Sequence, residues 1–194
     1  MSGVDLALVA LAYVLGSVPS GYIWARLLRG VDVTTAGSGN VGGMNVARNV
    51  SPVAGVLTGV SDFGKGALVT WLAAHYGTVP ATAMAAAVFA VLGHNYMLFL
   101  KFRGGKGLGV TAGSLAVLAP VAILYAAAVI VAASVILRDT NTGTGLGALL
   151  LWAAFGVSFG SAAWAWFGLA LGLVIFSKHL GDVRSYIKGR RQLV

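Results

Sequence analysis

The sequence predicts an all-α, polytopic integral membrane protein, a helical bundle of about seven transmembrane helices forming a single domain over residues 1–194. Of the 194 residues, 58% are hydrophobic and only 9% are charged, whereas a soluble domain carries about 25% charged residues. The mean hydropathy is +0.89, and the apolar runs approach the roughly 20 residues that cross a bilayer as a helix. The cations lie at the ends of these runs, where the positive-inside rule puts them.

The first half of the chain contains three apolar segments. A first span is expected over Val4–Ala25, followed by a loop over Arg26–Asn49. Apolar character returns over Pro52–Tyr76, with a polar interruption at Ser61–Gly66. A further span is expected over Ala81–Leu100.

The second half predicts two helical pairs. Residues 108–137 are too long for one straight span, and Pro120 divides them. Because proline ends or breaks a helix, two short antiparallel helices that turn near Pro120 are the simpler interpretation. Residues 145–158 and 161–177 then form a final pair, and one of the pairs could be re-entrant.

The distribution of lysine and arginine predicts the orientation. With the N-terminus outside and the C-terminus cytoplasmic, every cation cluster falls on the cytoplasmic side. The expected outer turns, at 77–80, 120 and 159, contain no lysine or arginine. The clusters are Arg26, Arg29 and Arg48; Lys101, Arg103 and Lys106; Arg138; and Lys178 onward.

Composition also excludes several functions. The net charge of +8 could suggest nucleic-acid binding, but the cations form no basic helix face with interleaved aromatics, so no nucleic-acid partner is expected. The chain has no cysteine, and its histidines (His75, His94 and His179) show no metal-ligand spacing, so no metal site is expected. Val4–Trp24 lacks a basic segment before it and is not expected to be a cleavable signal peptide.

A first polar cluster, GSGNVGGMNVAR, covers residues 37–48. Its glycines let main-chain N–H groups approach an oxyanion, and Arg48 can hold a phosphate with two hydrogen bonds. Asn40, Asn45 and Arg48 recur at spacings that bring them to one side of a turn or helix start. The alternative is a flexible loop.

A second cluster, DFGKG, lies inside an apolar segment and contains Asp62 and Lys65. An ionisable pair at that depth faces a polar cavity or is paired internally. The two side chains could neutralise each other at i,i+3, could line a pocket as an ion pair, or could do both.

The third cluster runs from His94 to Gly107 and ends in GGKG before the next expected helix. Consecutive glycines, a lysine and a helix N-terminus together favour anion binding. The spacing is not that of a Walker motif. Three such clusters on one membrane face predict a cytoplasmic pocket for an anionic, phosphorylated ligand, and the surrounding lipid makes an amphiphilic second ligand plausible.

The motifs GSGNVGGMNVAR, DFGKG, GHNYMLFLKFRGGKG and KHLGD, in this order, resemble the bacterial acyl-phosphate:glycerol-3-phosphate acyltransferases, the PlsY family. The resemblance covers essentially the whole chain. It implies a multi-pass enzyme of the bacterial inner membrane, without cofactor, that transfers a fatty acyl group from acyl phosphate to the 1-hydroxyl of sn-glycerol 3-phosphate. The products are lysophosphatidate and phosphate, the first step of phospholipid synthesis. We expect a monomer among membrane lipids.

The resemblance also implies roles for individual residues. Ser38, Arg48 and His179 carry over as catalytic, and a histidine or the departing phosphate could take the hydroxyl proton. The His-x4-Asp motif of other glycerolipid acyltransferases is missing from the sequence. Expected substrate-binding residues are Gly39, Asn40, Gly42, Asn45, His94, Gly104, Gly105, Lys106, Gly107, Asn141, Thr144 and Asp182.

The C-terminal motif departs from the family pattern. Asp182 replaces an asparagine, Ser185 stands near an expected arginine, and Arg191 falls where a glutamate is usual. A carboxylate among phosphates repels a dianion unless it is protonated or paired. Two alternatives to an active acyltransferase therefore stay open: an inactive lipid-binding relative, and a transporter of anions or phosphate esters.

Overall fold

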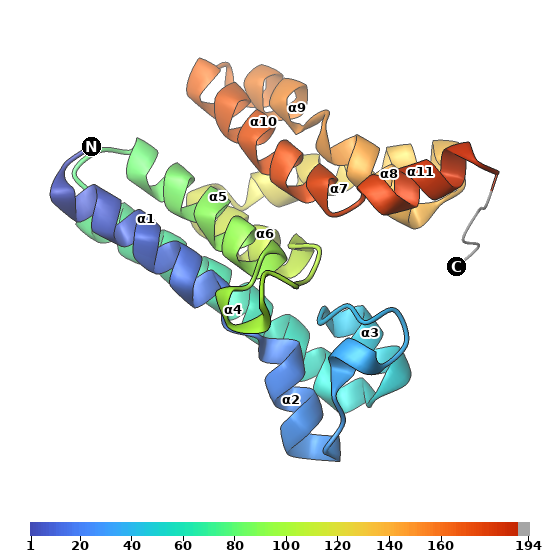
Figure 1. Cartoon of the computed structure of the whole chain (residues 1–194). Helices are drawn as coiled ribbons and strands as arrows, with labels where there is room; N and C mark the ends of the chain where they lie inside the picture. The colour runs from blue at the N-terminus through green and yellow to red at the C-terminus, as the bar shows by residue number, and fades with distance from the viewer. Residues whose placement is uncertain (190–194) are drawn as a thin grey trace. The chain divides into compact units, whose positions relative to one another are not determined.

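The computed structural model describes residues 1–189, and in that range every regular element is a helix (Figure 1). The chain divides into two compact units, Met1–Leu118 and Ala119 onward. The all-helical prediction is confirmed for the described residues. The single domain over residues 1–194 stays a prediction.

The first unit is built around its longest helix, α4, which contacts α1, α2, α3, α5 and α6. Because α4 touches every other α-helix of the unit, side chains on its different faces can reach separate loops. The elements are α1 (Gly3–Gly16), α2 (Ser20–Arg29), η1 (Val33–Thr35), α3 (Gly43–Asn49), α4 (Pro52–Tyr76), α5 (Ala81–Asn95), η2 (Leu98–Leu100) and α6 (Leu108–Leu118).

The segment expected as a first span is divided into α1 and α2. Helix α1 ends at Gly16, and Pro19 precedes the first residue of α2. At the break, the Ser17 hydroxyl donates to the carbonyl oxygens of Tyr13 and Gly93, at 2.8 and 3.3 Å. These bonds fix the break against α5.

Helix α4 runs without interruption through the polar stretch 61–66. The hydropathy break is therefore not a break in the helix, because Asp62 and Lys65 pair within it at i,i+3, with 2.9 Å between carboxylate Oδ1 and ammonium Nζ. Glycines bring α6 close to this helix: a Cβ on Gly66 would meet the main chain of Val110, and one on Gly113 would meet that of Phe63. Such small-residue contacts are typical of membrane helices.

A buried carboxylate fastens the start of α1 to the turn between α4 and α5. Asp5 is fully buried and accepts hydrogen bonds from the Thr78 N–H (2.7 Å), the Thr78 hydroxyl (2.6 Å) and the Thr82 hydroxyl (2.7 Å). Asp5 also forms a capping box with Ser2. These bonds compensate the cost of removing the charge from water. The sequence patterns gave no reason to single out Asp5.

The second unit contains α7 (Val121–Leu137), α8 (Thr140–Ala148), α9 (Leu151–Phe159), α10 (Ala162–Ser177) and α11 (Leu180–Ile187). The division at Pro120 is confirmed, since α6 ends at Leu118 and Pro120 precedes α7. Gly160, with φ +58°, ends α9. It lies at the turn that was expected between the last two predicted helices, 145–158 and 161–177. Helix α11 was not expected from the sequence.

Two helical stretches, Gly3–Arg29 and Ala81–Leu100, are long and apolar enough to cross a membrane. The number rises to four if each of two bent pairs, 140–159 and 162–187, is one span. Helices α6 and α7 are apolar but shorter. About seven crossings, and the sides on which the termini lie, stay predictions.

Two glycines of α4 give a matched test of this packing. Gly66→Ala places a methyl group against the Val110 main chain, and we expect it to lower the free energy of unfolding by about 1–3 kcal/mol. At Gly64, among the described residues, an added Cβ meets no atom within 4 Å. Gly64→Ala is therefore expected to be neutral or stabilising by up to about 1 kcal/mol.

Thermal unfolding in detergent measures both changes. Equal melting temperatures for the two variants would contradict close α4–α6 packing at Gly66.

Candidate active site

The first candidate loop, residues 36–42 before α3, is organised by the buried side chain of Asn45. Its amide nitrogen donates to the carbonyl oxygens of Ala36 (3.0 Å) and Asn40 (2.7 Å). Its amide oxygen accepts from the Ser38 N–H (3.1 Å) and the Asn49 amide (2.9 Å). All four hydrogen-bonding positions of Asn45 are therefore used within the loop and α3. These are the bonds of a residue that shapes the loop.

The same loop leaves Ser38 and Arg48 exposed. The Asn40 side chain turns back and accepts from the Gly42 N–H at 2.7 Å, just before α3 begins. Gly37 and Gly39 have φ angles of +57° and +70°, which glycine adopts without strain. The chain thus folds tightly around Asn45 while the hydroxyl and the guanidinium remain available to a ligand.

Asp32 fixes the chain just before η1 and the first loop. Its carboxylate accepts from the Thr34 hydroxyl (2.6 Å) and N–H (3.0 Å), and lies 3.1 Å from the Arg26 guanidinium. The hydrogen bonds from Thr34, with a smaller contribution from Arg26, hold the pKa of Asp32 below its ordinary value. Asp32 is therefore ionised at neutral pH and begins η1 as a cap.

The second candidate loop, Gly104–Gly107, lies directly on the last turn of α5. The Gly105 N–H donates to the His94 carbonyl oxygen at 3.0 Å. A Cβ on Gly104 would meet that carbonyl, and one on Gly105 would meet Nε2 of the His94 ring. Gly107 has a φ of +83°, and its Cβ would meet Val91 and Asn95. Close packing on α5 therefore requires these glycines, whether or not their N–H groups also bind an anion.

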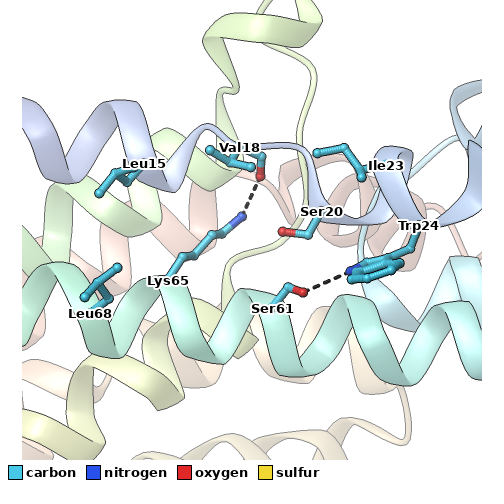
Figure 2. Close-up of a pocket in the computed structure, with 8 residues that line it drawn as sticks. All are labelled: Leu15, Val18, Ser20, Ile23, Trp24, Ser61, Lys65 and Leu68. Atoms are coloured by element: carbon cyan, nitrogen blue, oxygen red, sulfur yellow. Dashed lines mark hydrogen bonds between the residues drawn. The ribbon is translucent and has the colours of Figure 1, made fainter. Parts of the chain in front are cut away.

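Beneath this loop lies a chain of buried polar groups. His94 is 3% exposed, and its Nδ1 is 3.5 Å from the Asp62 carboxylate. Asp62 also pairs with Lys65 at 2.9 Å. The Lys65 ammonium donates to the Val18 carbonyl oxygen, at the break between α1 and α2 (Figure 2). The internal pairing expected of Asp62 and Lys65 is therefore present.

One apolar cluster joins the first loop to the segment that leads into the second loop. Val41 and Val46, from the first loop and α3, pack in the same core as Met97, which follows α5. Leu100, the last residue of η2 (Leu98–Leu100), packs against this core. The first loop and the segment that leads into the second loop are therefore held on one set of apolar contacts. Met97 carries no sequence signal that could have predicted this role.

The second unit holds the remaining predicted residues. His179 is 1% exposed, and its Nδ1 lies 2.9 Å from the Ile175 carbonyl oxygen. It packs against α8, where a Cβ on Gly145 would meet its side chain. Asn141 and Thr144 lie on the same helix α8. Asp182 lies in the first turn of α11.

No group of three or more histidine, aspartate or glutamate residues that could hold a metal occurs within residues 1–189.

A family model described as glycerol-3-phosphate acyltransferase matches residues 6–189. The chain belongs to this family. It is 36% identical to a glycerol-3-phosphate acyltransferase of Carboxydothermus hydrogenoformans, over 92% of this chain and 91% of that protein. It is 38% identical to one from Anaeromyxobacter sp. strain K, over 96% of each.

Solved structures of the family share the fold. The glycerol 3-phosphate form of PlsY (YgiH), an integral membrane glycerol 3-phosphate acyltransferase, matches with a TM-score of 0.84 at 29% identity, covering 98% of this chain and 95% of that one. The lysophosphatidic acid form matches with a TM-score of 0.83 at 28% identity, over the same shares. The chain is therefore similar to the acyltransferase over nearly its whole length.

The departures in the C-terminal motif can be placed in part. Asp182 sits at the N-terminal turn of α11, where the helix dipole favours a negative charge. This gives the carboxylate a structural reason to be there. Ser185 lies within α11 and is half-buried. Arg191 lies outside the described residues.

Asn45→Asp tests the role of Asn45 in the first loop. The change keeps the size of the side chain but replaces two N–H donors with carboxylate oxygen against the Ala36 and Asn40 carbonyls. We expect a loss of about 1–3 kcal/mol in local stability and faster hydrogen–deuterium exchange at the Ser38 and Gly42 amides.

Met44→Ala is the control, because Met44 neighbours Asn45 but its side chain is exposed. Unchanged exchange in Asn45→Asp would show that the loop does not depend on this side chain.

Proposed function

We propose that this chain transfers a fatty acyl group from acyl phosphate to the 1-hydroxyl of sn-glycerol 3-phosphate, giving lysophosphatidate and phosphate. The observation that carries the proposal is the apolar cluster that joins the first glycine-containing loop to the segment leading into the second. The family match and the solved glycerol 3-phosphate and lysophosphatidic acid forms of PlsY support it. The reaction brings two phosphate groups together, so cations from more than one segment are needed.

Within this proposal, the first loop and the second loop have different roles in phosphate binding. Arg48 neutralises phosphoryl oxygens with a two-pronged guanidinium, and Ser38 and Asn40 orient the group it holds. Lys106 and the N–H groups of Gly104 and Gly107 hold the phosphate of glycerol 3-phosphate, while the Gly105 N–H donates to the His94 carbonyl oxygen. Asn45, whose hydrogen bonds are all made within the loop and α3, supports Ser38 and Asn40 from behind.

The chemistry is a direct acyl transfer. The 1-hydroxyl oxygen attacks the carbonyl carbon of acyl phosphate, a C–O ester bond forms, and the bond between that carbon and the phosphate oxygen breaks. Acyl phosphate is a mixed anhydride with a good leaving group, so no covalent enzyme intermediate is required. Cations that meet the developing negative charge lower the barrier, and the two bound phosphates are brought into reacting distance.

The hydroxyl proton passes to His179 or to the departing phosphate. In the second unit, the contact between His179 Nδ1 and the Ile175 carbonyl requires a proton on Nδ1. In the neutral ring, Nε2 then carries the lone pair that can accept a proton.

The proposal places the enzyme in the bacterial inner membrane as a monomer, with its N-terminus outside. Its active site lies on the cytoplasmic side, where glycerol 3-phosphate is drawn from water and acyl phosphate from the lipid. Exposed arginines at Arg26, Arg29, Arg48 and Arg103 are consistent with that side under the positive-inside rule.

Purified protein, given acyl phosphate and labelled glycerol 3-phosphate, tests the activity. We expect the wild type to form labelled lysophosphatidate and phosphate in equal amounts. Arg48→Ala and Lys106→Ala are each expected to lower kcat/KM by at least about 100-fold, because each removes a cation that stabilises the transition state.

Arg29→Ala and Lys188→Ala, which remove exposed cations elsewhere, are matched controls and should leave the rate unchanged. Binding of glycerol 3-phosphate without product, in conditions where a relative turns over, would support the inactive alternative. Flux of glycerol 3-phosphate across proteoliposomes would support a transporter instead.

A further inference from the structure

The Asp62 carboxylate lies where three helices of the first unit meet. It projects from α4 and is 5% exposed. Its Oδ1 is 2.9 Å from Lys65 Nζ and 3.5 Å from His94 Nδ1 on α5. A Cβ on Gly109, in the first turn of α6, would lie 3.1 Å from the Asp62 Cβ. The carboxylate therefore contacts α5 directly and lies next to the start of α6.

His94 stands between this carboxylate and the second loop. One side of its ring faces Asp62 through Nδ1, and its Nε2 faces the main chain of Gly105. The His94 carbonyl accepts the Gly105 N–H at 3.0 Å. The ring and the main chain of His94 thus both support the Gly104–Gly107 loop. A rotation of the ring would therefore displace Gly105.

Lys65 holds the carboxylate in place. Its side chain is 9% exposed and donates to the Val18 carbonyl oxygen at 2.9 Å (Figure 2). A cavity of about 260 Å³ borders this ammonium. Because a buried carboxylate without a partner is costly, the pair fixes both groups against the break between α1 and α2. The cavity is lined by Leu15, Val18, Ser20, Ile23, Trp24, Ser61, Lys65 and Leu68.

We propose that Asp62 is a positioning residue that acts through His94 to hold the Gly104–Gly107 loop in the geometry that binds the phosphate of glycerol 3-phosphate. The inference rests on the proposed function, since it takes this loop as the phosphate site. Asp62 itself does not touch substrate. A displacement of about 1 Å at a bound reactant can cost on the order of 100-fold in rate, so the support beneath the loop matters to the reaction.

A purely structural ion pair predicts a different result. If Asp62 and Lys65 only stabilise α4 against α1, replacing Asp62 lowers the melting temperature and leaves the affinity for both substrates unchanged. If Asp62 acts through His94, the loss falls on glycerol 3-phosphate, and replacing His94 removes the effect of replacing Asp62. The two cases differ in kinetics as well as in stability.

The test is a double-mutant cycle of Asp62→Asn and His94→Gln in the full-length protein. We expect each variant to raise the KM for glycerol 3-phosphate by about tenfold, with the KM for acyl phosphate within twofold of wild type. We expect the double variant to be no worse than either single one, because residues that act in one chain are not additive.

Asp5→Asn is the matched control, since it neutralises a second buried carboxylate of the same unit, at the start of α1. It should lower the melting temperature without changing the KM for glycerol 3-phosphate. Asp62→Asn with a wild-type KM, equal increases in both KM values, or additive effects in the double variant would each overturn the proposal.

A second variant covers the case in which Asp62→Asn does not fold. Asp62→Asn combined with Lys65→Met removes both buried charges, so no unpaired ammonium remains. We expect the same selective increase in KM, and a folded protein with a wild-type KM would overturn the proposal.

Hydrogen–deuterium exchange separates this inference from the proposed function. Faster exchange at Gly105 in the Asp62→Asn, Lys65→Met double variant than in Asp5→Asn supports the positioning role even if no acyl transfer is found. Unchanged exchange at Gly105 overturns that role even if the wild type is active.

Discussion

Close contact with main-chain atoms, which glycine alone permits, holds the first unit of this chain together. Gly66 of α4 lies against the Val110 main chain of α6, and Gly113 lies against Phe63 in return. The same contact seats Gly104 and Gly105 on His94. Since apolar side chains gain little from packing against one another in lipid, such close approach is a main source of helix association there. The position of the second loop therefore depends on the packing that joins the helices.

The charges of the first unit follow from this arrangement. Its buried ones are compensated inside the protein: Asp5 by two threonines, and Asp62 by Lys65 and the neighbouring His94. The cations left at the loops, such as Arg48 and Arg103, are exposed. A ligand that carries phosphate thus meets positive charge at the loops.

Much of this could be predicted from the sequence, for reasons that differ between elements. Composition determined the all-helical membrane class, and Pro120 marked a real helix break. Hydropathy marked 61–66 as a polar interruption within Pro52–Tyr76, and the structure has one continuous helix over those residues in which Asp62 and Lys65 pair at i,i+3, as the sequence had suggested. The glycine motifs located both loops. Only the folded structure shows that the Asn45 side chain forms its hydrogen bonds within its own loop and α3, and that Gly105 packs on His94. The role of Asp5 in fastening α1 to the turn between α4 and α5 depends on Thr78 and Thr82, more than 70 residues away.

The central claim is that the two loops present their cations on the same side of the membrane, and side-specific labelling tests it most directly. The chain has no cysteine, so Thr35→Cys, Arg103→Cys and Val79→Cys each provide a single reactive site at an exposed position. With a membrane-impermeant maleimide, we expect Thr35→Cys and Arg103→Cys to react in inverted vesicles, and Val79→Cys to react in intact cells. Reaction of Thr35→Cys and Arg103→Cys from opposite sides would contradict a shared phosphate site.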